Sequence, residues 1–438
     1  MTTLHGLVRR LAVTITGSVA ITSLGYAQQP PDVVQSDNRA NTAMGYDALF
    51  SLSASGANNT AAGSQALYSN TSGSDNTAYG VNALYFNETG SDNTSLGEES
   101  LGRNTTGGRN TAVGLAALFA NSTGSANTAL GWWALAGPSG RLGFSTGSFN
   151  TGAGYAALSS NVNGTANTAL GANALFKNTT GNNNTAAGYQ ALFSNTSGIG
   201  NAAFGIVSLF SNTDGQRNAA LGGQSLNHNT TGSFNTAVGF EALWLNTTGS
   251  NNVGVGLQAG YQVTTGSNNV DIANTGGAGD SGKIRIGTEG TQNATYIAGI
   301  SGTHVTGAAV YVTSTGQLGV LASSERYKTA VAPMSSTTER LKELRPVIFR
   351  LKTDPKAGRQ FGLIAEEVAK VYPELVIRGE KGQIEGVRYE ELTPMLLNEL
   401  QEQQRTIADQ GKQLRDMRQQ LTELQEFRRS MQRRAANQ

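Results

Sequence analysis

The chain has 438 residues, a formal net charge of +1 and no cysteine. A charge near zero gives no reason to expect a nucleic-acid or membrane-surface partner, and the lack of cysteine excludes disulfides and thiolate-bound metals. Charged residues make up only 14% of the chain and glycines number 56, unlike an ordinary globular protein. The three histidines, His5, His228 and His304, lie far apart in sequence, so we expect neither a metal site nor another cofactor.

The N-terminus has the pattern of an export signal. Arg9 and Arg10 precede the apolar run LAVTITGSVAITSL, and Ala27 ends a small-residue cleavage pattern. The run is shorter and richer in Thr and Ser than a membrane-spanning helix needs. We therefore predict a signal peptide over residues 1–27, a linker over residues 28–40, no transmembrane segment in the mature chain, and an extracellular or cell-surface location.

Residues 41–260 repeat a unit with the consensus N-T-A-x-G-x-x-A-L-x-x-N-T-x-G-x-x. Most units span 17 residues, and self-similarity at a fixed period is typical of solenoids. The fifth residue is always glycine, which indicates positive φ or a close backbone approach. The ninth is leucine from Leu49 to Leu243, and we expect the leading Asn and Thr to form hydrogen-bonded ladders. The units begin at Asn41, Asn59, Asn76, Asn93, Asn110, Asn127, Asn150, Asn167, Asn184, Asn201, Asn218, Asn235 and Asn252.

Each unit reliably supplies only one large apolar side chain. Its burial stabilises by about 2 kcal/mol, whereas ordering each backbone residue costs roughly 1–2 kcal/mol. We therefore expect a mostly β fold, a parallel β-solenoid or β-roll with two short strands per rung, assembled as a homotrimer that shares burial between chains. Helical A-L-x-x-N turns are the open alternative. The N-T-A-x-G-x-x-A-L units resemble the head repeats of trimeric autotransporter adhesins, which are left-handed parallel β-rolls.

The C-terminal third differs from the repeats. Residues 261–322 contain short apolar runs such as GKIRIG and AAVYVTSTGQLGV, and we predict a β-rich neck there. Charged residues become frequent from Ser323 onward, which indicates a domain boundary. We predict a small α+β domain over residues 323–395 and a trimeric coiled coil over residues 396–438. The coiled-coil positions are Leu400, Ile407, Leu414 and Leu421 at a, and Leu396, Gln403, Gln410, Met417, Leu424 and Met431 at d.

The segments SSERYK, LKELRPVIFRLK, FGLIAEEVAKVYPELV and VRYEELTPMLLNELQEQ resemble the peptidase S74 family, the intramolecular chaperone domains of endosialidase-type tail fibres. The resemblance implies that the domain assists trimerisation and then cuts itself off. The implied nucleophile is Ser323, the implied base is Lys328, and the cut is the Ala322–Ser323 bond. A desolvated lysine of depressed pKa can deprotonate a serine. The family's Asp position holds Ser324 here, which is the alternative nucleophile.

Three functions of different classes follow from these patterns. The first is a secreted or cell-surface trimeric fibre, adhesin-like, with single-turnover Ser–Lys autoproteolysis. Its partners would be surface glycans or proteins, bound by avidity. The alternative is a tailspike-like enzyme that degrades polysaccharide, which needs a catalytic carboxylate pair. The insertion AGPSGRLGFS around Pro138 contains no Asp or Glu. A flat Thr-rich face that binds ice or mineral is the third alternative.

Overall fold

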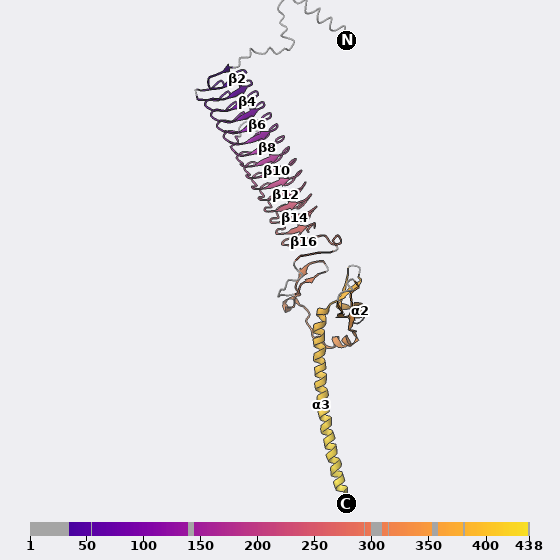
Figure 1. Cartoon of the computed structure of the whole chain (residues 1–438). Coiled ribbons are helices and arrows are strands. Elements are labelled where there is room, and N and C mark those ends of the chain that lie inside the picture. The colour runs from indigo at the N-terminus through magenta and orange to yellow at the C-terminus, as the bar shows by residue number, and fades with distance from the viewer. Residues whose placement is uncertain are drawn as a thin grey trace, which may run out of the picture. The chain divides into compact units, whose positions relative to one another are not determined.

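The computed structural model describes residues 35–53, 55–138, 144–292, 294–298, 309–313, 315–352, 358–379 and 382–436. The chain forms two compact units, Met1–Tyr296 and Ile297–Gln438 (Figure 1). The predicted signal peptide, residues 1–27, lies outside the described residues. Among the described helices, none is both long enough and apolar enough to cross a membrane.

The first unit is a β-solenoid, which confirms the expectation drawn from the repeat. Its one 16-stranded sheet follows chain order (Figure 1). Neighbouring strands from β2 to β16 pair in parallel and in register, as Thr185 does with Thr168 and Ala202. The strands are β1 (Gln35–Ser36, antiparallel to β2), β2 (Thr42–Met44), β3 (Thr60–Ala62), β4 (Thr77–Tyr79), β5 (Thr94–Leu96), β6 (Thr111–Val113), β7 (Thr128–Leu130), β8 (Thr151–Ala153), β9 (Thr168–Leu170), β10 (Thr185–Ala187), β11 (Ala202–Phe204), β12 (Ala219–Leu221), β13 (Thr236–Val238), β14 (Val253–Val255), β15 (Val270–Ile272) and β16 (Ile284–Ile286). Strand stacking therefore continues into the segment expected to be the neck.

Each described rung has one three-residue strand, so the expectation of two strands per rung is wrong. The reason is backbone conformation. In the unit that starts at Asn59, the φ angles of Gly63, Gln65 and Leu67 are 138°, 58° and 51°, whereas a β-strand needs negative φ. These residues form a turn that still bonds to its neighbours, since the Leu67 N–H donates to Ala83 O at 2.9 Å.

The invariant fifth-position glycine has both properties that the sequence predicts. Gly171 has a φ of 129°, and a Cβ built on it would lie 2.6 Å from the carbonyl oxygen of Gly188 in the next rung. Any other residue would therefore combine an unfavourable φ with a steric clash against backbone. The glycine sets the closest approach of successive rungs at the end of the strand.

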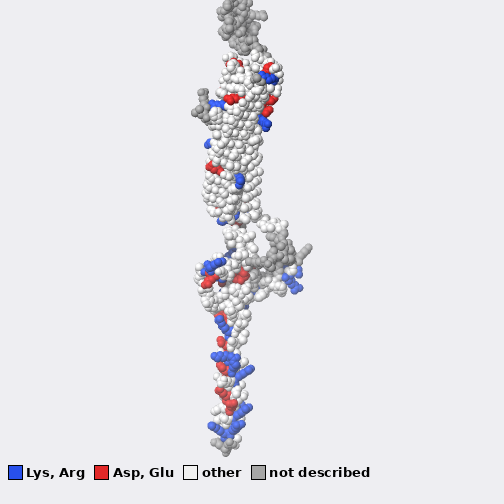
Figure 2. Space-filling model, turned by 90° about the vertical axis from the view of Figure 1, so that its left-hand side faces the viewer, with Lys and Arg blue, Asp and Glu red and all other residues white. Residues whose placement is uncertain are grey.

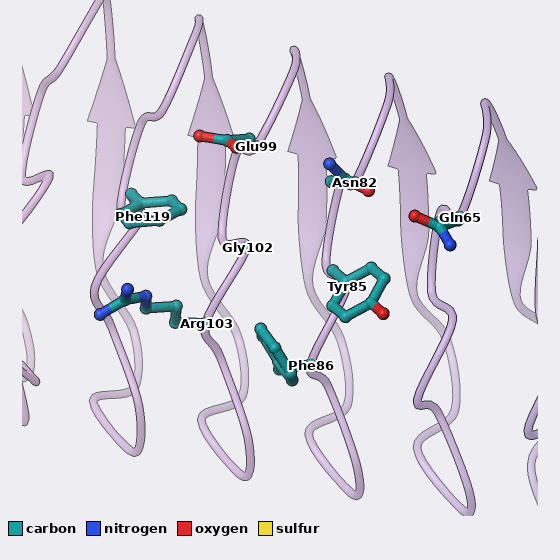
Figure 3. A pocket seen from close by; sticks show the side chains of 8 residues that line it. All are labelled: Gln65, Asn82, Tyr85, Phe86, Glu99, Gly102, Arg103 and Phe119. Carbon is teal, nitrogen blue, oxygen red and sulfur yellow. The ribbon is translucent and has the colours of Figure 1, made fainter. Parts of the chain in front are cut away.

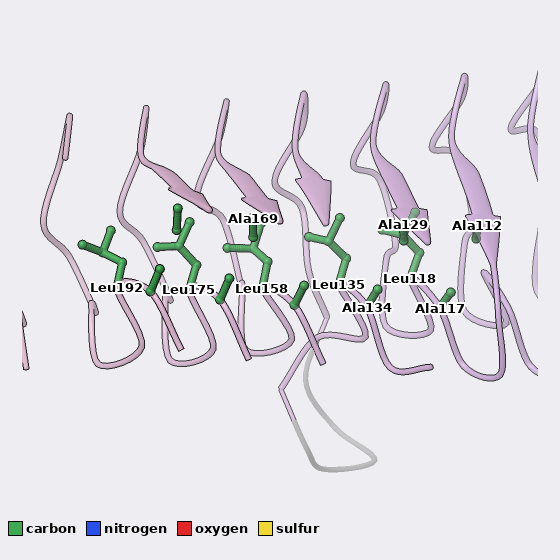
Figure 4. Packing of buried hydrophobic residues seen from close by; sticks show 14 of the residues in the cluster. Ala112, Ala117, Leu118, Ala129, Ala134, Leu135, Leu158, Ala169, Leu175 and Leu192 are labelled. Atoms are coloured by element: carbon green, nitrogen blue, oxygen red, sulfur yellow. The ribbon is translucent and has the colours of Figure 1, made fainter. Parts of the chain in front are cut away.

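The apolar interior is a column of leucines flanked by alanines (Figure 4). Leu175 and Leu192 are fully buried, as are Ala169 and Ala186 in the middle of the adjacent strands. Each of these leucines has a left-handed backbone, a conformation that costs roughly 1–2 kcal/mol per residue. The left-handed turn is nevertheless retained in every rung from Leu49 to Leu243, and it places this side chain inside the coil.

The first-position asparagines form a continuous buried ladder through the solenoid, as the sequence predicts. The Asn184 side chain donates from Nδ2 to Asn167 Oδ1 at 3.2 Å and to Gly198 O at 2.8 Å. The Asn184 backbone N–H also donates to Asn167 Oδ1, at 3.0 Å. Asn184 Oδ1 in turn accepts two hydrogen bonds from Asn201. The second-position threonines lie half-buried in the strands.

A second buried asparagine ladder occupies the twelfth position of the repeat. Asn195 Nδ2 donates to Asn178 Oδ1 at 2.8 Å and to Gly198 O at 3.1 Å. Gly198 O therefore accepts from both ladders, which joins the two columns across the rung. These polar columns add to the burial supplied by the leucines. A single chain thus has a larger interior than one leucine per unit implies.

The leucine column ends at Gly260, and a buried carboxylate, Asp271, lies beside that position in β15. Asp271 is 1% exposed and its Oδ2 has no hydrogen-bond partner among the described residues. A Cβ on Gly260 would lie 3.2 Å from this oxygen. Burial, assisted by the negative charge of Asp280 and opposed by Arg285, raises the pKa of Asp271 to about 6. Asp280 itself is paired with Arg285 at 2.6 Å.

The described part of the second unit contains short hairpins, one short α-helix and one long α-helix. Its core consists of the buried residues Val368, Tyr372, Leu375, Val376, Val387, Leu392 and Met395. The hairpins are β17 (Tyr311–Val312) with β18 (Leu318–Gly319), β19 (Val347–Phe349) with β20 (Gln360–Gly362), and β21 (Val376–Arg378) with β22 (Ile384–Val387). The helices are α2 (Ala365–Val371), α3 (Tyr389–Ala436) and the 3₁₀ helices η2 (Glu325–Tyr327), η3 (Ser335–Glu343) and η4 (Pro373–Leu375).

We predict that Asn184→Ala destabilises the solenoid, because it leaves the buried N–H of Asn201 without an acceptor. An unsatisfied buried group of this kind costs about 1–3 kcal/mol. Urea unfolding followed by the β-sheet circular dichroism signal measures the loss. Asn163→Ala is the control, since Asn163 is exposed, and its effect should stay within about 0.5 kcal/mol. Equal losses in the two variants would contradict a stabilising ladder.

We predict that Asp271→Asn stabilises the C-terminal rungs at pH 8 but not at pH 4. The folded-state pKa of about 6 lies above the ordinary 3.8, so folding opposes ionisation and the penalty grows as pH rises from about 4 to 6. Two pKa units correspond to at most about 3 kcal/mol. Hydrogen exchange at both pH values tests this. Asp75→Asn, at an exposed carboxylate, should not stabilise the rungs at either pH. If Asp271→Asn stabilises the rungs as much at pH 4 as at pH 8, ionisation of Asp271 is not the cause.

Candidate functional site

The predicted cleavage residues lie at a short turn near the start of the second unit. Ser324 precedes η2 with extended backbone, and Lys328 follows it. The turn is closed by backbone hydrogen bonds from the Tyr327 N–H to Ser324 O at 3.0 Å and from the Lys328 N–H to Glu325 O at 2.9 Å. Ser323 stands one residue before this turn. Both hydrogen bonds join residues three apart in sequence, so the turn is held by local backbone contacts.

Ser323, Ser324 and Lys328 are all exposed in the single chain. Within the described residues, the side chains of Ser323 and Lys328 form no hydrogen bond or ion pair with each other or with another group. A serine–lysine pair needs a desolvated lysine within hydrogen-bond reach of the serine. The single chain therefore places the two residues on either side of one short turn, but does not supply the burial that their chemistry requires.

The N-terminal end of α3 is held by the core of its unit through buried polar contacts. Asn398 Nδ2 donates to Ser335 O at 3.0 Å and to Thr338 Oγ1 at 2.7 Å, and Thr338 is 1% exposed. Tyr372 Oη donates to Thr337 O at 3.0 Å. These contacts join the first part of α3 to η3, and η3 to the end of α2, so the direction in which the helix leaves the domain is set by the fold.

Beyond Glu399 the heptad face of α3 is exposed. Its apolar side chains are 48–66% exposed: Leu400, Ile407, Leu414, Met417, Leu421, Leu424 and Met431. Charged side chains of both signs surround this face (Figure 2). An amphipathic stripe needs a partner surface to bury it, and no described residue of this chain covers it. We call these residues the α3 stripe.

The solenoid has an exposed apolar surface of its own. It combines the last residue of most strands with the residue that follows the invariant glycine, and the large apolar side chains at these positions are 37–74% exposed. Its large members are Met44, Tyr46, Tyr79, Val81, Leu96, Leu115, Leu130, Trp132, Tyr155, Leu170, Tyr189, Phe204, Ile206, Leu221, Val238, Phe240, Val255, Leu257 and Ile272. We call this set the solenoid stripe. Thirteen steps of about 4.8 Å make it roughly 60 Å long.

Sequence reasoning missed the solenoid stripe, although a signal for it exists. Successive strand residues point to opposite faces. The middle strand residue is usually alanine and buried, as Ala169 is, whereas the next is often large, as Leu170 is. A large apolar residue beside a small buried one indicates an outward apolar surface, provided that the strand is known to be three residues long. Monomers rarely expose contiguous apolar patches of more than a few hundred Å².

The described residues contain no group of three His, Cys, Asp or Glu side chains that could hold a metal ion. Some charged side chains of the second unit form surface pairs, such as Arg345 with Glu367, at 2.6 Å. This pair lowers the pKa of the Glu367 carboxyl. Exposed pairs of this kind contribute little to stability.

Comparison with known proteins gives one result for the C-terminal region. Residues 323–377 match the sequence-family model described as chaperone of endosialidase, Peptidase_S74. The match begins at Ser323 and includes Lys328. No curated protein and no solved structure matches the chain. The chain therefore carries, downstream of a β-solenoid, a segment similar to the chaperone-of-endosialidase family.

Proposed function

We propose that this protein is a trimeric, tail-fibre-like or adhesin-like fibre that is exported and acts outside the cell. The solenoid forms the shaft, and the C-terminal domain with α3 promotes assembly of three chains and then removes itself. The observation that carries the proposal is the exposed α3 stripe, which directly follows a domain similar to a fibre chaperone.

Two apolar surfaces support self-association. The α3 stripe has the heptad spacing of a coiled coil, and Gln403 and Gln410 at d positions would fix its register and chain number. The solenoid stripe runs along nearly every rung, and a second and third copy would cover it over its whole length. A parallel coiled coil would bring identical rungs of identical chains to the same height.

The exposure of Ser323 and Lys328 in one chain supports cleavage that waits for assembly. Packing of three chains would bury Lys328 and lower its pKa, because burial disfavours the ammonium form. Ser323 Oγ would then attack the carbonyl carbon of Ala322 as its proton passes to the Lys328 amine. The peptide C–N bond breaks, the Ser323 amine is released, and water hydrolyses the resulting ester. The reaction occurs once per chain.

We predict that Ile407→Asp converts the full chain from trimer to monomer, as measured by sedimentation equilibrium. Ile407 is 66% exposed, so the change removes no contact within the chain and helix content should persist. Ala408→Asp is the matched control, because Ala408 neighbours Ile407 but falls at the outer b position of the heptad. A monomeric wild-type chain, or a trimeric Ile407→Asp chain, would contradict the proposed role of α3.

We predict that mass spectrometry of the purified full chain detects a C-terminal fragment that begins at Ser323. Ser323→Ala and Lys328→Ala should abolish the fragment, and Ile407→Asp should abolish it too because assembly fails. Lys342→Ala is the control for loss of an exposed lysine. Ser324→Ala should still be cleaved. If the Ser324→Ala chain is not cleaved, Ser324 is the nucleophile in place of Ser323. A wild-type chain that forms trimers but is not cut would contradict the proposed protease activity. The proposed role in assembly would stand.

A further inference from the structure

The tenth position of the repeat carries a ladder of aromatic rings on the outside of the solenoid. Phe50, Tyr68 and Tyr85 stack in parallel, with ring centroids 5.2 Å and 5.0 Å apart. A second run stacks in the same way, from Phe176 through Phe193 to Phe210, with separations of 5.2 Å and 5.1 Å. Each ring in the ladder therefore takes up one rung spacing, about 5 Å.

The ladder is interrupted at Gly102, where the repeat has no side chain at the tenth position. Tyr85 lies in the rung before and Phe119 in the rung after, so two rung spacings separate them. A cavity of about 240 Å³ opens here, lined by Gln65, Asn82, Tyr85, Phe86, Glu99, Gly102, Arg103 and Phe119 (Figure 3). Pockets for drug-sized ligands span about 300–1,000 Å³, so this one suits a single ring.

The tenth position also lacks an aromatic ring at Ala136, Ser159 and Asn227. The interruption at Asn227 shows that such a gap is not always open. There the neighbouring His228 packs edge-on against Trp244, with ring centroids 4.2 Å apart. At Gly102 the corresponding neighbour is Arg103, whose guanidinium lies over the ring of Phe119 at 4.9 Å. Phe86 packs edge-on against Tyr85 at 4.6 Å and forms one side of the cavity. The slot at Gly102 thus has aromatic walls and a cationic rim.

Polar groups line the slot beside the rings. Gln65, Asn82 and Glu99 come from the seventh position of three successive rungs. Asn82 Oδ1 is buried and has no hydrogen-bond partner in the described part of the chain. A buried amide oxygen without a donor costs free energy, and a ligand hydroxyl would supply that donor. In two distant rungs the seventh-position side chains satisfy each other, since Gln258 Nε2 donates to Glu241 Oε2 at 2.8 Å.

We propose that this slot binds one pyranose ring of an uncharged saccharide. A C–H face of the sugar ring would pack against the aromatic side chains that line the cavity, Tyr85, Phe86 and Phe119, because aromatic faces carry partial negative charge and attract C–H groups. Its hydroxyls would donate to Asn82 Oδ1 and Glu99 and accept from Arg103. Glu99 and Arg103 cancel each other's charge, which favours a neutral ring over an acidic one. The slot is present in a single chain, and only the threefold avidity rests on the proposed trimer.

The full chain is tested on an array of immobilised neutral oligosaccharides of hexose and N-acetylhexosamine, with indole as an aromatic competitor in solution. We expect binding to at least one saccharide. Gly102→Phe, which restores the ladder ring, should weaken that binding at least tenfold by calorimetry. Glu99→Gln should weaken it severalfold, whereas Glu241→Gln, at the same repeat position in a distant rung, should not change it.

Circular dichroism checks that Gly102→Phe folds, since a Cβ at Gly102 would lie 3.2 Å from the Phe119 ring and that ring must shift slightly. If this variant does not fold, Glu99→Gln with its Glu241→Gln control decides the question. No saccharide binding by the wild type, unchanged binding by Glu99→Gln, or binding of indole alone would overturn the proposal. Sedimentation of the same samples reports trimer formation separately, so loss of the slot and loss of assembly are distinguishable.

Discussion

The stacking of one buried asparagine on the next is the interaction on which the solenoid depends. Each first-position asparagine bonds to the same residue of the rung before, the rung after, and a glycine carbonyl of its own rung. A ladder of this kind has only one register, because a shift of one residue would leave buried amide groups unpaired. The parallel sheet, the leucine column and the aromatic ladder all follow that register.

Because of this polar interior, a single chain does not need partner chains to complete the inside of its solenoid. One leucine per unit indicated that a single chain was too poorly packed and needed partners to complete its core. The structure instead places two asparagine ladders, alanines and the leucine inside one coil. The surfaces that call for partners lie outside: the solenoid stripe and the α3 stripe. Association of chains would therefore cover the exposed side chains of these two stripes and would not fill the interior of the solenoid.

The second unit shows a related separation between local structure and environment. Ser323 and Lys328 lie on either side of one short turn, but both are exposed. The chemistry proposed for this pair needs low polarity, which a single chain does not provide here. Such a design would couple peptide cleavage to completed packing and would protect an unassembled chain from early loss of its chaperone.

The sequence by itself determined the repeat length, the parallel solenoid, the constrained glycine and the first asparagine ladder, because each depends on a residue type recurring at a fixed interval. It also located the heptad positions of α3. Only the tertiary structure decided that each rung has one strand, that leucines such as Leu192 adopt a left-handed backbone, and that the Gly102 gap stays open. The sign of φ at a non-glycine residue leaves no mark in a hydrophobic pattern. Whether a gap is open or filled depends on neighbouring rungs, which the chain brings together only after it has coiled.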